Sequence, residues 1–223
     1  KAFKGSLVLL FTLMSSWSLM AQIDRSVQPQ PKAAPKIQLE DPQTFTLSNG
    51  LKVLVVENHK LPRVRVQLLL DNPPVLEGEK AGVSSLTGAL LGKGSSNISK
   101  DDFNEEVDFL GATISFSGQS AFASTLSRYF PRILELMAEA AFNPNFSQEE
   151  FEKEKERFIE NLRSEEKDVS AVARRVQSAL AYGTAHPYGE FVSIESLEKV
   201  TLQDVSDFYA RYFSPDNAYL VLI

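Results

Sequence analysis

The pair Asn49-Gly50, set between strand-like runs at 44–47 and 51–57, constrains the fold more than any other short stretch of the sequence. An Asn-Gly pair favours a tight β-hairpin, because both central positions of such a turn adopt positive φ angles. The run VRVQLLL at 64–70 is rich in β-branched residues and leucine and predicts a third strand. The folded part of the chain is therefore expected to begin with consecutive strands.

Helices and strands then follow in blocks. Apolar spacing and capping residues predict helices at 81–91, 99–110, 131–142, 147–167, 169–182 and 201–212, and strands at 113–117, 121–127 and 218–223. Ser147 and Glu150 predict a reciprocal capping box at the start of the fourth helix. Such blocks indicate an α+β fold, a two-layer sandwich in which helices cover one face of a largely antiparallel sheet. The 223 residues, 43% of them hydrophobic, suffice for a core of that kind.

The first residues have the pattern of an export signal. Lys1 and Lys4 precede an apolar run that is too short to span a bilayer, so residues 1–21 are predicted to be a secretory signal peptide, cleaved after Ala21. Residues 22–43 contain several prolines and predict an extended tether that leads into a domain at 44–223. The mature protein is thus expected in the periplasm or outside the cell, without a transmembrane anchor.

The composition limits the chemistry that the chain can perform. There is no cysteine, which excludes disulfides, thiolate zinc sites and cysteine nucleophiles. The two histidines, His59 and His186, stand in turn-like contexts and are interpreted as exposed or capping imidazoles rather than metal ligands. A net charge of −6 without a basic cluster argues against nucleic acid as a partner.

Six phrases, taken in order, resemble the insulinase/pitrilysin-type metallopeptidase family, which includes mitochondrial processing peptidases and non-catalytic relatives. The phrases are TFTLSNGLKVLVVENHKLPRVRVQLLL, AGVSSLTGALLGKGSSNIS, FNEEVDFLGATISFS, NPNFSQEEFEKEKERFIENL, HPYG and VTLQDVSDFYARYFSPDNAYLVLI. They cover nearly all of the sequence from Thr44 onward. The resemblance implies the N-terminal domain of such a peptidase. Because the sequence stops inside an apolar strand, we expect it to be a piece of a longer chain.

Active members of that family carry H-x-x-E-H on the first helix, where two imidazoles hold Zn²⁺ and the glutamate activates water. When the flanking Ala-Gly and Lys-Gly pairs are aligned, the resemblance puts Ser85 and Ala89 at the two histidines and Gly88 at the glutamate. None of these residues can bind zinc, and Gly88 cannot accept a proton. The resemblance therefore implies that no catalytic residue is present at this motif.

The third zinc ligand of active members is a carboxylate on the long charged helix. The resemblance puts Asn161 at this position, whereas a shift of one residue puts Glu160 there, and Glu154 takes another acidic position of the same helix. In either alignment too few ligands remain for the three-ligand shell of a catalytic zinc ion. No metal or cofactor is therefore expected in this chain.

The resemblance implies a non-catalytic half of a peptide-degrading or peptide-processing chamber. Its partner would be a zinc-bearing homologous subunit in a heterodimer, zinc would be found only in that partner, and the two would share extended peptides as substrates. Two alternatives remain open. The chain can instead be a structural or assembly subunit with no role in proteolysis, or part of a peptidase whose zinc site lies beyond Ile223.

Overall fold

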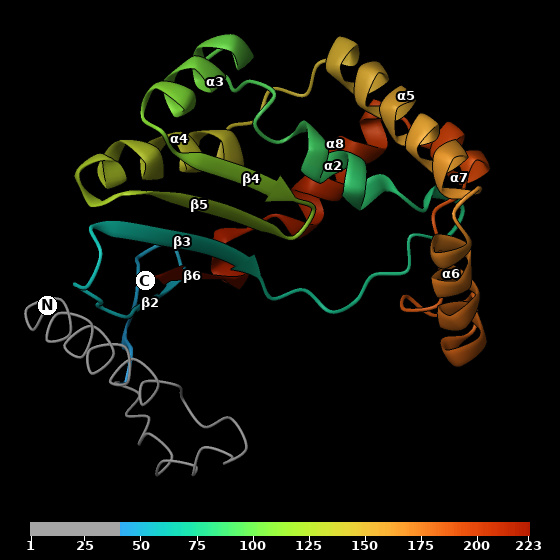
Figure 1. Cartoon of the computed structure of the whole chain (residues 1–223), viewed down its shortest axis with the longest axis horizontal. Coiled ribbons are helices and arrows are strands. Elements are labelled where there is room, and N and C mark those ends of the chain that lie inside the picture. Colours follow the sequence, from blue (N-terminus) through green and yellow to red (C-terminus); the bar gives the residue numbers. More distant parts are fainter. Residues whose placement is uncertain (1–40) are drawn as a thin grey trace, which may run out of the picture. The chain divides into compact units, whose positions relative to one another are not determined.

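A six-stranded sheet organises residues 41–223, the part of the chain that the computed structural model describes (Figure 1). The strands are β1 (Gln43–Thr46), β2 (Lys52–Val55), β3 (Arg63–Leu70), β4 (Thr113–Ser117), β5 (Ser120–Leu126) and β6 (Ala218–Leu222). They lie in the order β1-β2-β6-β3-β5-β4, and β2 with β6 is the one parallel pair among them. The sheet is thus largely antiparallel, as predicted. The predicted signal peptide and nearly all of the predicted tether lie outside the described residues.

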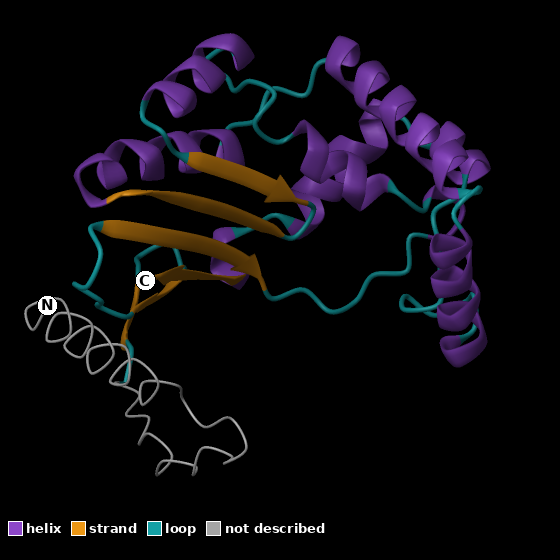
Figure 2. Ribbon diagram, in the orientation of Figure 1, coloured by secondary structure: helices purple, strands orange, loops and turns teal. Residues whose placement is uncertain are grey.

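The α-helices of this region follow the predicted blocks (Figure 2). They are α2 (Val83–Leu90), α3 (Lys100–Phe109), α4 (Phe130–Phe142), α5 (Gln148–Glu165), α6 (Val169–Tyr182), α7 (Ile194–Lys199) and α8 (Leu202–Tyr212). Each predicted helix and strand is present, with ends displaced by at most two residues. The short helix α7 was not predicted. The α+β fold class is confirmed.

Two apolar clusters hold these elements together. The first joins the sheet to α3 and α4 through residues such as Leu68, Ala123 and Ile133. The second joins α2 to α5, α7 and α8, with Leu86 and Phe151 almost completely buried in it. In Figure 1 this second group of helices lies beyond the carboxyl ends of β3 and β4. Helix α2 contacts β4 of the sheet as well as α5 and α8, so it lies at the junction between the sheet and the outer helices.

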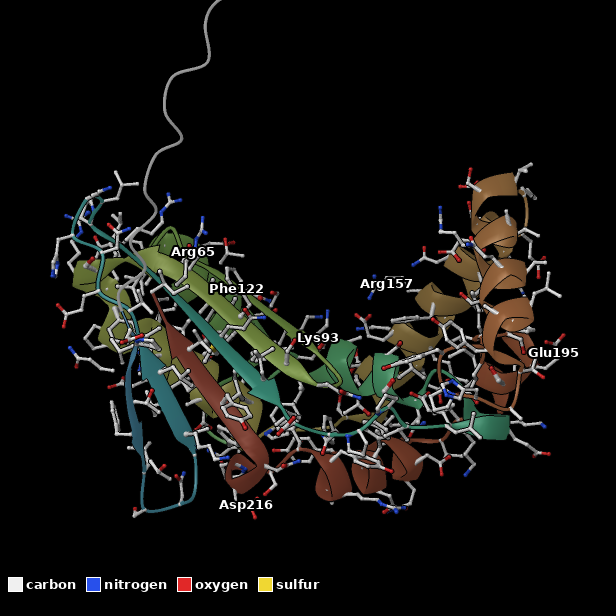
Figure 3. All side chains as sticks on the ribbon, turned by 90° about the horizontal axis from the view of Figure 1, so that it is seen from below. Arg65, Lys93, Phe122, Arg157, Glu195 and Asp216 are labelled. Carbon is white, nitrogen blue, oxygen red and sulfur yellow. The ribbon has the colours of Figure 1, made fainter. Side chains whose placement is uncertain are left out.

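The opposite face of the sheet is more open. Along β3, the residues Val66, Leu68 and Leu70 are buried, whereas the alternating residues are exposed or partly exposed. Figure 3 shows Arg65 of β3 and Phe122 of β5 on the same side of the strands. The helices therefore cover one face, as the two-layer prediction requires. No helix within residues 41–223 is long and apolar enough to span a bilayer.

The Asn49-Gly50 hairpin joins β1 to β2, but its geometry differs from the prediction. The amide of Gly50 donates to the carbonyl of Leu47 at 3.0 Å. The amide of Leu47 in turn donates to the carbonyl of Leu51 at 2.9 Å. Ser48, Asn49 and Gly50 therefore form a three-residue loop. Only Gly50 has a positive φ, of 90°, because the additional residue lets Asn49 keep the usual negative value.

The predicted capping box at the start of α5 is only half formed. The hydroxyl of Ser147 accepts the amide of Glu150 at 3.2 Å. The carboxylate of Glu150 does not return to Ser147 but accepts hydrogen bonds from Lys100 at 2.9 Å and Lys153 at 3.5 Å. The prediction of a reciprocal box was wrong here because ammonium donors make stronger, charge-assisted hydrogen bonds to a carboxylate than a neutral amide does.

Candidate functional site

Helix α2 carries the motif positions and is fixed at its start by a carboxylate. Val83, Leu86 and Leu90 form its buried apolar face. Glu77 precedes the helix and accepts the amide N–H of Gly82 at 2.6 Å and the hydroxyl of Ser84. An anion at this end satisfies free N–H groups and interacts favourably with the helix dipole. The helix is therefore held in a defined place, although nothing on it can bind a metal.

Two of the motif positions open into a pocket of about 550 Å³. Ser84, Ser85 and Ala89 of α2 form one side, residues 116–119 at the β4–β5 turn form a second, and Arg157 and Phe158 of α5 form the third. Ser85 is exposed and Ala89 is partly buried. The pocket thus lies where the resemblance puts the two zinc-binding histidines of active members.

Gly88, which takes the position of the glutamate in the motif, has no free space around it. A Cβ atom at this residue would lie 2.4 Å from the carbonyl carbon of Ser117 and 2.5 Å from the amide nitrogen of Gly118. A Cβ atom at Gly118 would in turn lie 2.4 Å from the carbonyl oxygen of Ser84. Helix and turn are therefore packed backbone against backbone. The place of a glutamate side chain at position 88 is taken by the β4–β5 turn.

The carboxylate of Glu154 on α5 already pairs with two positively charged side chains. It is 6% exposed and accepts hydrogen bonds from Nζ of Lys93 at 2.8 Å and Nε of Arg157 at 2.9 Å. Burial by itself would raise the pKa of Glu154, but the hydrogen bonds from Lys93 and Arg157 outweigh it and hold the pKa below its ordinary value. Figure 3 shows both cations between the end of the sheet and α6. A carboxylate held in this way is a poor ligand for a metal.

The other residues considered from the sequence lie outside the pocket. Asn161 is exposed, and Glu160 is paired with Arg163 one helical turn further on. His59 is exposed and contacts Glu57, whereas His186 accepts the amide of Tyr188 at 3.1 Å and is also exposed. Across residues 41–223, no group of three His, Cys, Asp or Glu side chains is placed to hold a metal ion.

Sequence reasoning missed Arg157 and Lys93 as residues of this region. The spacing of Glu154 and Arg157 by three residues on a helix is a signal for their ion pair. Lys93 is far from Glu154 in sequence, so no local signal indicates that contact. The structure brings Ser85, Ala89 and Arg157 together around the pocket, whereas Asn161 and Glu160 do not line it.

Comparisons with known proteins agree on one family. The family model "Insulinase (Peptidase family M16)" matches residues 52–187. The chain is 26% identical over 190 residues to mitochondrial-processing peptidase subunit beta of Mus musculus. This match covers 82% of the present chain and 39% of the relative. It is 24% identical over 215 residues to cytochrome b-c1 complex subunit 1 of Bos taurus, covering 94% of this chain and 44% of that one.

A solved structure supports the same relationship. The crystal structure of a peptidase M16 inactive domain from Pseudomonas fluorescens matches with a TM-score of 0.72 and 25% identity, covering 82% of this chain and 46% of that one. The chain therefore spans less than half the length of the relatives it matches.

Proposed function

We propose that this chain, which belongs to the insulinase family of peptidases (peptidase family M16), serves as a non-catalytic half of a peptide chamber. A homologous subunit that carries H-x-x-E-H would supply the zinc ion and the hydrolysis. The chain itself would supply one wall of the chamber and contacts to an extended peptide. Residues 1–21, if they act as a signal peptide, would place this assembly in the periplasm or outside the cell.

One observation carries the proposal. Gly88, the residue at the position of the general base in active members, packs directly against the β4–β5 turn, and its neighbours Ser85 and Ala89 offer no metal ligand. The hydrogen bonds that Glu154 accepts from Lys93 and Arg157 add a second, independent reason, because they satisfy the one buried carboxylate of residues 41–223 without a metal. The similarity to a domain described as inactive supports the same reading.

The sheet offers a place for an extended peptide. Strand β4 lies at the end of the strand order and has one neighbouring strand, β5. An edge strand has free N–H and C=O groups that can pair with an added strand, and the main-chain hydrogen bonds formed in this way do not depend on the side chains of the peptide. Binding by main-chain hydrogen bonds at β4 would therefore suit a chamber that accepts many peptides.

The test is reconstitution with a homologue from the same organism that carries H-x-x-E-H. Alone, this chain is expected to hydrolyse no unstructured peptide and to contain far less than one zinc ion per chain by metal analysis. Mixing the two is expected to give a complex by size-exclusion chromatography and to raise hydrolysis by about tenfold or more, because the second half positions the peptide. A homologue with glutamine in place of its motif glutamate must stay inactive in the mixture.

The other outcomes separate the alternatives. A complex that forms without any change in hydrolysis would favour a structural or assembly subunit, to which the similarity with a cytochrome b-c1 complex subunit lends support. Hydrolysis by this protein alone, with one tightly bound zinc ion, would contradict the proposal and favour a zinc site beyond Ile223.

A further inference from the structure

The pocket beside α2 contains a guanidinium group with hydrogen-bonding capacity left over. Arg157 directs Nε and Nη2 to the same oxygen atom of Glu154. A guanidinium has five N–H donors, so this contact leaves several of them available. Within the described part of the chain, Nη1 of Arg157 makes no hydrogen bond, and the side chain is 57% exposed. The group is thus fixed on one side and open to a ligand on the other.

The ion-paired group beside the pocket carries a net positive charge, whereas the carboxylate of Glu77, bound to the hydroxyl of Ser84, is already taken up by the start of α2. Within residues 41–223, Glu154 is the one anion bound by Lys93 and Arg157, so this group of three carries one more positive than negative charge. Among the described residues that line the pocket, Arg157 is the only charged one. An ion pair with a buried carboxylate also limits the rotamers of Arg157, so less entropy remains to be lost when a ligand binds. The pocket is therefore suited to an anion rather than to a metal cation.

The rest of the pocket favours an organic anion of moderate size. Its volume of about 550 Å³ lies in the range of small-molecule sites. Phe116 and Phe158 contribute apolar surface, whereas Ser85 and Gln119 contribute polar groups. Phe116 and Ser117 belong to β4, so a peptide paired with that edge strand would run past the pocket. A guanidinium can bind a planar carboxylate through two parallel hydrogen bonds, and carboxylates are the anions that a peptide itself carries.

We propose that this pocket binds a carboxylate group of a peptide, with Arg157 as the recognising residue and Phe116 and Phe158 as the apolar walls. That the ligand is a peptide, and its anionic group therefore a carboxylate, rests on the proposed function, whereas the preference for an anion rests on the pocket alone. The carboxylate can come from the C-terminus of a peptide or from an Asp or Glu side chain. A guanidinium would then act at the place where active members hold zinc.

The test compares acids with matched amides on the full chain. N-acetylphenylalanine against its amide probes a C-terminal carboxylate, and N-acetylglutamate α-amide against N-acetylglutamine α-amide probes a side-chain carboxylate. Binding is followed by NMR titration at millimolar concentrations. At least one acid is expected to bind about tenfold or more tightly than its amide, because only the acid pairs with a guanidinium. The pair that shows this preference identifies the source of the carboxylate.

Two variants show which residue is responsible. Arg157→Gln is expected to remove the preference for the acid. Arg163→Gln is the matched control, since Arg163 lies on the same helix, is 56% exposed, and pairs with Glu160 outside the pocket. Equal binding of acid and amide, absence of binding by all four probes, or an unchanged preference in Arg157→Gln would overturn the proposal. Reconstitution with a zinc-bearing homologue tests the proposed function separately, so either idea can fail without the other.

Discussion

Replacing Gly88 by glutamate is expected to disrupt the contact between α2 and the β4–β5 turn and to leave little folded protein in solution. Even the first atom of a side chain at position 88 would lie 2.4 Å from the backbone of Ser117. Overpacking of a core costs about 1–3 kcal/mol, and more where the obstructing atoms belong to the backbone and cannot turn away. Gly88→Ala should therefore lower the melting temperature by about 6–12 °C, a loss of roughly 3 kcal/mol.

The matched control places the same side chain three positions earlier on α2. Ser85→Glu puts a carboxylate at an exposed position of the pocket, on the side where Arg157 lies. This variant should fold and melt within a few degrees of the wild type. Thermal unfolding followed by circular dichroism measures both variants. A Gly88→Glu protein that is soluble and melts like Ser85→Glu would contradict the packing argument.

The same contact predicts how an attempt to rebuild the zinc motif will end. A triple variant with Ser85→His, Gly88→Glu and Ala89→His would recreate the letters of H-x-x-E-H. It is expected to be no more stable than Gly88→Glu alone, because the β4–β5 turn still fills the space. The double variant without Gly88→Glu should fold, since both of its histidines face the open pocket. Rebuilding the motif is therefore expected to require a displaced β4–β5 turn as well as three substitutions.

Local signals were sufficient for most of the fold. Val83, Leu86 and Leu90 have the spacing of a buried helical face, and Ser99 caps α3 through the amide of Asp102, as expected of a serine at that position. Helix α7 escaped prediction because it is six residues long, and its cap pairs Ser193 with Ser196 rather than with a glutamate or glutamine. Short elements give a weak periodic signal.

The candidate site depends on contacts that sequence patterns do not encode. The insertion of β6 between β2 and β3 joins segments from opposite ends of the described region. The approach of Gly88 to Ser117, and of Lys93 to Glu154, likewise depends on how separate elements pack. From the sequence alone, a glycine at position 88 indicated only the absence of a catalytic base. The structure adds that a side chain has no room there.

Replacing Glu154 by glutamine is expected to lower the free energy of unfolding by about 2 kcal/mol at neutral pH, because hydrogen bonds to a charged group are lost. Lys93 and Arg157 would then stay close together without their shared anion. A fully buried pair would cost more, but these two side chains are 29% and 57% exposed and can turn toward water. Urea unfolding measures the change. Glu160→Gln is the control, since Glu160 is 60% exposed and should change stability by no more than about 0.5 kcal/mol.

The difference between the wild type and Glu154→Gln is expected to shrink in acid. Because the pKa of Glu154 is lowered in the folded protein, the unfolded chain takes up this proton at a higher pH than the folded one does. The stabilisation by Glu154 is therefore complete above the ordinary carboxyl pKa of 4.5 and is lost as the pH falls through the lowered value. Glutamine does not take up a proton in this range, so the free energy of unfolding of Glu154→Gln does not change with pH through this group. A difference that remained constant from neutral pH down to about pH 3 would show that Glu154 acts through packing and not through its charge.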